Sequence, residues 1–159
     1  MIEQYESGSY PLLNSPRPYA LMGTHKHIPE MQTHVGLKRP PLFLPVVSNF
    51  YRGLAVSVPL HMSMLQEGIT GQAVHEALSA RYAGEAFVRV MPLSDPATLE
   101  SGYFDVQGSN DTNRCDLFVF ASDKQIVLIG RIDNLGKGAS GAAVQSMNLH
   151  LGLGEGAGL

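Results

Sequence analysis

The amino-acid sequence predicts an α+β fold, with a mostly antiparallel sheet and helices on one face of it. Two β-rich runs near the C-terminus are joined by a short polar connection, which indicates a hairpin. One earlier segment has the apolar periodicity of a helix, and most other apolar runs are short and separated by turn residues. The other sheet face would then be free to meet a partner.

Length and composition indicate one globular domain over residues 1–159. The chain has 159 residues, of which 44% are hydrophobic and 16% charged, enough for one good core. A formal net charge of -3 without clusters of lysine and arginine argues against a nucleic-acid or membrane-surface binder. No apolar run approaches the roughly 20 residues of a membrane span. We therefore expect neither nucleic acid nor a membrane as a partner.

The single cysteine, Cys115, excludes an internal disulfide and suits a reducing cytoplasm. The segment 1–6 lacks the basic and then apolar layout of a signal peptide, so we expect a cytoplasmic protein. Cys115 precedes an apolar run and has no adjacent histidine to lower its pKa. We interpret it as a buried or half-buried sheet residue and not as a nucleophile.

The N-terminal third of the sequence predicts short elements separated by breakers. Glycine and proline interrupt residues 7–18, which we therefore expect to form a loop after the end of a helix. Pro29 suits the first turn of a helix, and Gly36 suits its end. The expected elements are a strand over 19–22, a helix over 29–35 and an irregular or edge strand over 42–47, which contains Pro45.

The remaining sequence has stronger signals. Residues 54–62 alternate imperfectly, as a half-buried strand does, with Leu54, Val56, Val58 and Leu60 on one face. Thr70 is the expected N-cap of a helix that runs to residue 82. The other expected elements are a strand over 87–91, the hairpin over 115–120 and 125–132, a helix over 137–151 and a loose glycine-rich tail over 152–159.

A compact acid/base cluster lies around Pro29. His25 and His27 are two residues apart, so in an extended segment their side chains point the same way, and Glu30 follows in the first helical turn. Histidine titrates near neutral pH, which favours proton transfer with Glu30 as an orienting carboxylate. A zinc site would need further ligands, for which His34 and His61 are the spare histidines. A third interpretation is a set of surface histidines in a capping loop.

Two further features suggest ligand contacts. Arg52 precedes a strand, where it would clamp a carboxylate or phosphate, although solvated surface arginines are commoner. The segment 136–141 matches the pattern G-x-G-x-x-G between a strand and a helix. A complete dinucleotide site needs a second parallel strand and a later acidic residue, for which the chain has no room. The glycines either permit close helix packing or place a helix N-terminus, with Lys137, near a cofactor held by another domain.

Taken together, these segments resemble the C-terminal domain of N-acetyl-gamma-glutamyl-phosphate reductases of arginine biosynthesis. The resemblance covers nearly the whole chain, and its longest motif is the most specific. The matching stretches are residues 1–6, residues 19–32 with His-Lys-His-Ile-Pro-Glu, residues 43–58 with Asn-Phe-Tyr-Arg-Gly, residues 113–116, and residues 132–148 with Ile-Asp-Asn-Leu-Gly-Lys-Gly-Ala-Ser-Gly.

The resemblance implies a fold like the C-terminal domain of glyceraldehyde-phosphate and aspartate-semialdehyde dehydrogenases. It also implies an NADPH-dependent reduction of an acyl phosphate to a semialdehyde. In this family a cysteine forms a thioester with the substrate, and a histidine of the His-x-His-x-Pro-Glu motif assists proton transfer. Here that histidine is His25 or His27. The resemblance assigns Glu30 to orienting the histidine or touching substrate, and Arg52 to holding the anionic substrate.

Asn134 and Lys137 would approach the NADP cofactor, which the Rossmann domain of the enzyme would mainly bind. This chain lacks that domain, and Cys115 does not match the family's nucleophile. We therefore expect a fragment that is inactive alone and that pairs into a homodimer or tetramer. The residues around Tyr19 also depart from the family's usual tyrosine-glycine stretch.

Two other hypotheses remain open from the sequence. A non-catalytic dimerisation or interaction module would explain the missing nucleophile and cofactor domain. Half of a lysine-pathway reductase, acting on a longer carrier-linked acyl phosphate, would share the same motifs.

Overall fold

The structure, a computed structural model, describes the backbone of residues 2–159 and the side chains of residues 3–159. The chain divides into two compact units, Met1–Tyr51 and Arg52–Leu159. The functional residues predicted from the sequence are distributed over both units.

The first unit consists of short elements joined by loops. Helix α1 spans Ile2–Glu6, and the tight 3-10 turn Pro11–Asn14 follows it. Strands β1 (Arg17–Pro18) and β2 (Val46–Val47) pair antiparallel. Between them, α2 spans His27–Val35 and ends at Gly36, whose left-handed backbone (φ 71°) suits glycine.

Of the two strands predicted in this unit, one is absent and the other is shorter than predicted. Residues 19–22 form no strand, because β1 lies just before them and Tyr19 adds only a single hydrogen bond from its N–H to the Pro45 carbonyl, 3.0 Å. In the segment 42–47, only Val46–Val47 pairs. Pairing between segments about 30 residues apart, and not local sequence pattern, decides where these strands lie.

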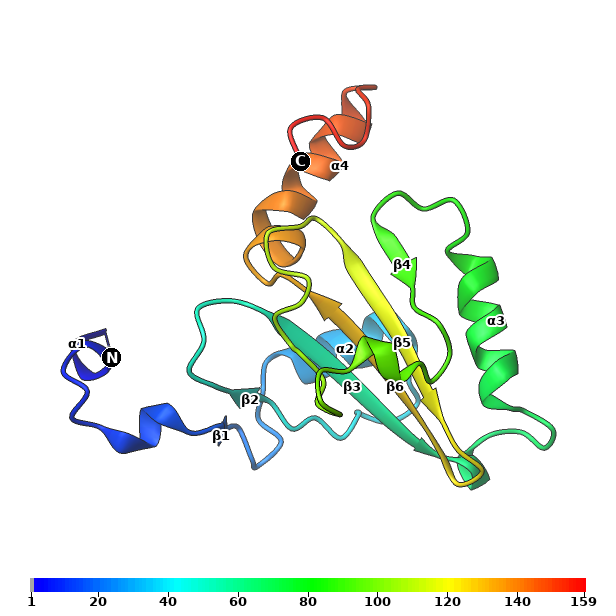
Figure 1. The fold of residues 1–159 in the computed structure, drawn as a ribbon, viewed down its shortest axis with the longest axis horizontal. Coiled ribbons are helices and arrows are strands. Elements are labelled where there is room, and N and C mark those ends of the chain that lie inside the picture. The colour runs from blue at the N-terminus through cyan, green and yellow to red at the C-terminus, as the bar shows by residue number, and fades with distance from the viewer. Residues whose placement is uncertain (1) are drawn as a thin grey trace. The chain divides into compact units, whose positions relative to one another are not determined.

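The second unit is built on a four-stranded sheet in the order β3-β6-β5-β4 (Figure 1). The strands β3, β6 and β5 pair antiparallel, whereas β4 runs parallel to β5. The mostly antiparallel α+β fold is therefore confirmed. The strands are β3 (Leu54–His61), β4 (Val88–Val90), β5 (Cys115–Ala121) and β6 (Gln125–Ile132).

Helix α3 (Gly71–Arg81) lies beside β4 and β5 and begins as predicted (Figure 1). The Thr70 hydroxyl accepts a hydrogen bond from the Ala73 N–H, 3.1 Å, so it satisfies one of the first free amides of the helix. The His75 imidazole Nε2 and the Met91 carbonyl are 2.9 Å apart, which fixes the helix to the segment after β4.

The hydrophobic core lies on both faces of β5. Phe118 and Val119 are adjacent, so their side chains point to opposite faces, and both are buried. Phe104, from the loop after β4, stacks edge to face on Phe118 with ring centroids 4.9 Å apart. Ile126 of β6 is also fully buried. A strand buried on both faces explains the apolar run over residues 117–120.

The edge strand β3 carries exposed apolar side chains. Its register with β6 places Leu54, Val56 and Val58 on one face, as predicted. These side chains are 38%, 50% and 45% exposed, so the face expected to be half-buried is largely open in this chain. Pro59 is tolerated because an edge strand has one side free of ladder hydrogen bonds.

The C-terminal helix starts with a wider turn. Residues Gly136–Ser140 form a π-helical turn that leads into α4, Gly141–His150. The amide of Asn148, in α4, donates hydrogen bonds to the carbonyls of Glu155 and Ala157 in the segment after the helix, at 3.0 and 2.9 Å. Whether residues 152–159 are mobile stays a prediction.

No helix within residues 2–159 combines the length and the apolar character needed to cross a membrane.

Candidate functional site

The first unit brings the three predicted acid/base residues together at the start of α2. The rings of His25 and His27 meet edge to face with centroids 4.7 Å apart. His27 Nε2 lies 3.9 Å from Glu30 Oε2, one helical turn away. Both side chains are at least half exposed, so this ion pair contributes little to stability. The side chains of His25, His27 and Glu30 therefore lie close together, and those of His27 and Glu30 remain accessible to a ligand.

The backbone of this cluster differs from the prediction. Lys26 has helical angles (φ -58°, ψ -26°), and His27 is already the first residue of α2. The two histidines are therefore not side by side on an extended segment. Pro29 is accommodated because it lies in the first helical turn, where a missing N–H breaks no intrahelical bond. The rings still meet, because the chain turns between them.

His25 has further partners that the sequence did not indicate. The Tyr19 hydroxyl lies 3.2 Å from His25 Nε2, and the N–H of His27 donates to His25 Nδ1, 3.2 Å. Phe43 meets the other edge of the ring, with centroids 5.0 Å apart. Both ring nitrogens of His25 are thus engaged.

In the second unit, Arg52 is held by two carboxylates. Its guanidinium contacts Asp111 and lies 3.4 Å from Asp133 Oδ2. The next residue, Gly53, donates its N–H to Asn134 Oδ1, 2.7 Å. This bond holds Asn134 next to the backbone of Arg52, so two of the predicted site residues lie close together. Gly53 has φ 126°, and a side chain there would meet the Val106 carbonyl, so glycine is required for this approach.

Asp133 organises the backbone around Arg52 and Asn134, a role that was not predicted from the sequence. Its Oδ1 accepts hydrogen bonds from the N–H groups of Leu135 and Gly136, at 2.9 and 3.0 Å. Its Oδ2 accepts one from the N–H of Asp111, 3.0 Å. An aspartate just before a helical turn is a typical capping signal, which the sequence did contain.

The carboxylate of Asp133 is buried, and its neighbours favour the charged form. Burial raises its pKa, but the three amide hydrogen bonds and the charge of Arg52 outweigh burial and hold the pKa below the ordinary value. A lowered pKa stabilises the fold above the ordinary aspartate pKa, and this contribution is lost as pH falls through the folded-state value.

We predict that replacing Asp133 by asparagine weakens the acid dependence of stability. The free energy of unfolding of the parent chain should fall as pH drops below about 4, because the unfolded chain then binds a proton at Asp133 that the folded chain does not yet bind. Asp133→Asn should be less stable at neutral pH and lose less on acidification. Denaturant titrations at several pH values measure both effects, and parallel pH curves for the two chains would contradict the prediction.

The predicted cofactor residue Lys137 lies in the π-helical turn. Its ammonium donates to Gln145 Oε1 and lies 5.6 Å from the centre of the Phe87 ring. Within the glycine-rich segment, a Cβ on Gly141 would collide with Asn113 Oδ1. The close packing that small residues permit is therefore present here, and the cofactor interpretation stays a prediction.

A buried charge cluster lies on β5, and the sequence did not reveal it. The fully buried Asp116 accepts hydrogen bonds from Arg89, Arg114 and Arg131 at distances from 2.8 to 3.4 Å, and from Ser109 at 2.9 Å. Burial raises the pKa of Asp116, but these hydrogen bonds outweigh burial and leave it lowered.

Cys115 is a half-buried strand residue, as predicted. Burial and, to a smaller extent, the neighbouring Asp116 charge raise the pKa of its thiol. A raised pKa leaves little thiolate at neutral pH, so Cys115 is a poor nucleophile.

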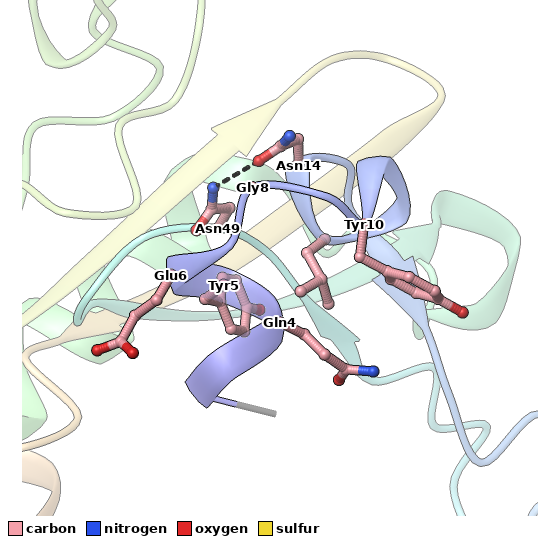
Figure 2. Close-up of a pocket in the computed structure, with 8 residues that line it drawn as sticks. Gln4, Tyr5, Glu6, Gly8, Tyr10, Asn14 and Asn49 are labelled. Atoms are coloured by element: carbon pink, nitrogen blue, oxygen red, sulfur yellow. Dashed lines mark hydrogen bonds between the residues drawn. The ribbon is translucent and has the colours of Figure 1, made fainter.

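A surface pocket in the first unit does not coincide with the predicted site. Figure 2 shows it beside α1, with Asn49 donating a 3.0 Å hydrogen bond to Asn14. The pocket is lined by Gln4, Tyr5, Glu6, Gly8, Tyr10, Leu13, Asn14 and Asn49.

Within residues 2–159, no three histidine, cysteine or carboxylate side chains gather in a way that could hold a metal ion.

Comparison with known proteins identifies matches over most of the chain. Residues 6–134 match the family model described as semialdehyde dehydrogenase, dimerisation domain. An N-acetyl-gamma-glutamyl-phosphate reductase 2 of Nostoc sp. is 47% identical over 144 residues, which cover 89% of this chain and 45% of the relative.

Two other relatives bear the name N-acetyl-gamma-glutamyl-phosphate reductase. That of Rhizobium etli is 45% identical over 154 residues, covering 95% of this chain and 49% of the relative. That of Burkholderia ambifaria is 40% identical over 154 residues, covering 96% and 48%. The chain spans about half the length of the curated relatives it matches.

Proposed function

The chain belongs to the family of semialdehyde dehydrogenase dimerisation domains, and on this premise we propose that it forms half of an N-acetyl-gamma-glutamyl-phosphate reductase. This half would supply proton transfer, substrate binding and dimerisation. The observation that carries the proposal is the match at 40–47% identity to relatives with that name. The reaction would reduce the acyl phosphate to N-acetylglutamate semialdehyde in the cytoplasm, as a step of arginine biosynthesis.

The acid/base work is assigned to the cluster at the start of α2. His25 and His27 have adjacent rings, and Glu30 lies within ion-pair distance of His27. Reduction of an acyl group to an aldehyde adds a hydride to carbon and a proton to oxygen or to a leaving group. An imidazole is suited to handle that proton near neutral pH.

Arg52 is assigned to binding the anionic substrate. A guanidinium presents several N–H donors in a plane, which matches a carboxylate or phosphate. Its partner Asp111 is exposed, whereas Asp133 is buried. A substrate anion would therefore compete with Asp111, while Asp133 keeps the arginine in place.

Asn134 and Lys137 are assigned to the nicotinamide cofactor, which we propose to be NADP. Lys137 provides a positive charge at the start of the C-terminal helix, where anions are favoured. When bound, the cofactor supplies the hydride. The Rossmann domain that would hold most of it is a proposed partner of this chain, on the same polypeptide or on another.

A genetic experiment tests the reductase proposal. A chimaera joins residues 1–159 to the remaining part of the Nostoc sp. relative. The chimaera should restore growth without arginine to bacteria that lack their own N-acetyl-gamma-glutamyl-phosphate reductase, whereas residues 1–159 alone should not. Failure of the chimaera beside a complementing Nostoc parent would contradict the proposal.

We also propose that the exposed face of β3 pairs with a second copy of the chain, as the name of the family suggests. Leu54, Val56 and Val58 form an apolar surface at the sheet edge. A homodimer would bury this surface, and two dimers would make a tetramer.

Val56→Glu should weaken dimerisation by about tenfold or more, because a buried and unpaired carboxylate costs at least 1–3 kcal/mol. Ser57→Glu on the opposite face of the same strand is the matched control and should leave the dimer intact. Analytical ultracentrifugation over a concentration series measures both. A parent chain that sediments as a monomer, or equal dissociation constants for the two variants, would contradict this interface.

A further inference from the structure

The ring of His25 is held by three neighbouring rings and two hydrogen-bond partners of its own unit. Tyr19, His27 and Phe43 each meet it edge to face, with centroid separations of 5.5, 4.7 and 5.0 Å. The Tyr19 hydroxyl and the His27 backbone amide contact its two nitrogens. This is more restraint than an exposed capping histidine needs.

These contacts determine which nitrogen carries the proton. A backbone N–H can only donate, so His25 Nδ1 must be the acceptor of the 3.2 Å bond from His27. In neutral His25 the proton is therefore on Nε2, which donates to the Tyr19 oxygen 3.2 Å away. Protonation of Nδ1 would set two N–H groups against each other and break the bond to the His27 amide.

His27 is placed differently. Among residues 2–159, no hydrogen bond reaches either of its ring nitrogens, and the Glu30 carboxylate lies 3.9 Å from Nε2. A ring with an open nitrogen and a carboxylate beside it can take up and release a proton without losing a contact.

We propose that the geometry divides the roles of the two histidines and that Tyr19 is a positioning residue. Tyr19 and the His27 amide hold His25 as the Nε2–H tautomer. A substrate oxygen that takes the place of the Tyr19 oxygen as acceptor then meets a neutral hydrogen-bond donor. His27, with Glu30 beside it, gains and releases the transferred proton. The division of catalytic roles rests on the proposed reductase function, whereas the tautomer of His25 does not.

Nuclear magnetic resonance tests the tautomer directly on the 159-residue chain. Long-range correlations between ring protons and ¹⁵N at about pH 8.5, where imidazoles are mostly neutral, report which nitrogen is protonated. His25→Gln identifies the His25 signals by their disappearance. We expect a protonated-type Nε2 and an unprotonated-type Nδ1 for His25.

The variant Tyr19→Phe should move the ¹⁵N shifts of both His25 nitrogens part of the way toward those of two exchanging tautomers, because the His27 amide alone still favours the Nε2–H form. Tyr10→Phe is the matched control, because Tyr10 is exposed to a similar degree (48% against 43%) in the same unit. An Nδ1–H tautomer in the parent, or a Tyr19→Phe spectrum equal to that of the parent, would overturn the positioning role.

Glutamine variants test the division of roles in the chimaera. A glutamine amide can donate a hydrogen bond near the place of Nε2–H but cannot carry a proton in catalysis. His25→Gln should therefore lower kcat by up to about tenfold, whereas His27→Gln should lower it by about 10²–10⁴-fold. Equal losses would overturn the division of roles. An inactive parent chimaera with the expected His25 tautomer would instead reject the reductase function and leave the positioning by Tyr19 standing.

Discussion

Replacing His25 and His27 together by alanine lowers kcat of the chimaera by about 10²–10⁴-fold, the range for loss of a general acid or base. Both rings that could donate to substrate or handle its proton are then absent, while α2 retains Pro29 and Glu30 in its first turn. Alanine is also a good helix former, so the start of α2 should persist. The loss should therefore appear in kcat more than in the stability of the protein.

His34→Ala is the matched control for this prediction. His34 is in the last turn of the same helix, about one turn beyond Glu30, and is exposed. Steady-state kinetics should give parent-like kcat for His34→Ala, and circular dichroism should give equal helix content for both variants. Full activity after the double substitution would remove the acid/base assignment.

Asp116→Asn is expected to destabilise the chain by about 3–5 kcal/mol, because removing one partner of a buried ion pair leaves uncompensated charge. Asp116 is fully buried and is the shared acceptor of Arg89, Arg114 and Arg131. Arg131 is itself nearly buried, so its charge cannot be rehydrated as easily as that of the two outer arginines. Asparagine keeps the shape of aspartate but not its charge.

Two comparisons make the Asp116 prediction specific. Asp123→Asn changes an exposed aspartate in the β5–β6 turn and should alter stability by no more than about 0.5 kcal/mol. Arg89→Met removes a half-exposed arginine and leaves Asp116 two others, so its cost should be smaller than that of Asp116→Asn. Denaturant unfolding measures all three, and an Asp116→Asn chain as stable as Asp123→Asn would contradict the role of the cluster.

Local signals in the sequence predicted the elements that depend on neighbouring residues. Thr70 caps α3 through an amide three residues away, and the hairpin strands β5 and β6 are joined by a short polar turn. The contacts among His25, His27 and Glu30 also join residues that are close in the sequence. The α+β class was likewise predicted from apolar patterns that each extend over a few residues. In each case the physical cause lies within a few residues.

The misses have causes far apart in the sequence. Strand β1 is defined by pairing with Val46–Val47, and no local pattern marked Arg17–Pro18 as its position. The Asp116 cluster joins Arg89 of β4, Arg114 just before β5 and Arg131 of β6, so it depends on sheet order and register. The contact of Tyr19 with His25 is the exception: the two residues are only six positions apart, and the contact forms because the chain turns back between them.

The most direct test of the account is the reaction itself, measured with the purified chimaera. With N-acetylglutamate semialdehyde, phosphate and NADP, the chimaera should produce NADPH, followed by its absorbance, at a rate comparable with that of the Nostoc parent. The double variant of His25 and His27 should produce almost none. A parent that reacts beside a folded chimaera that does not, or a chimaera that prefers a longer carrier-linked semialdehyde, would contradict the assignment of this chain to an N-acetyl-gamma-glutamyl-phosphate reductase.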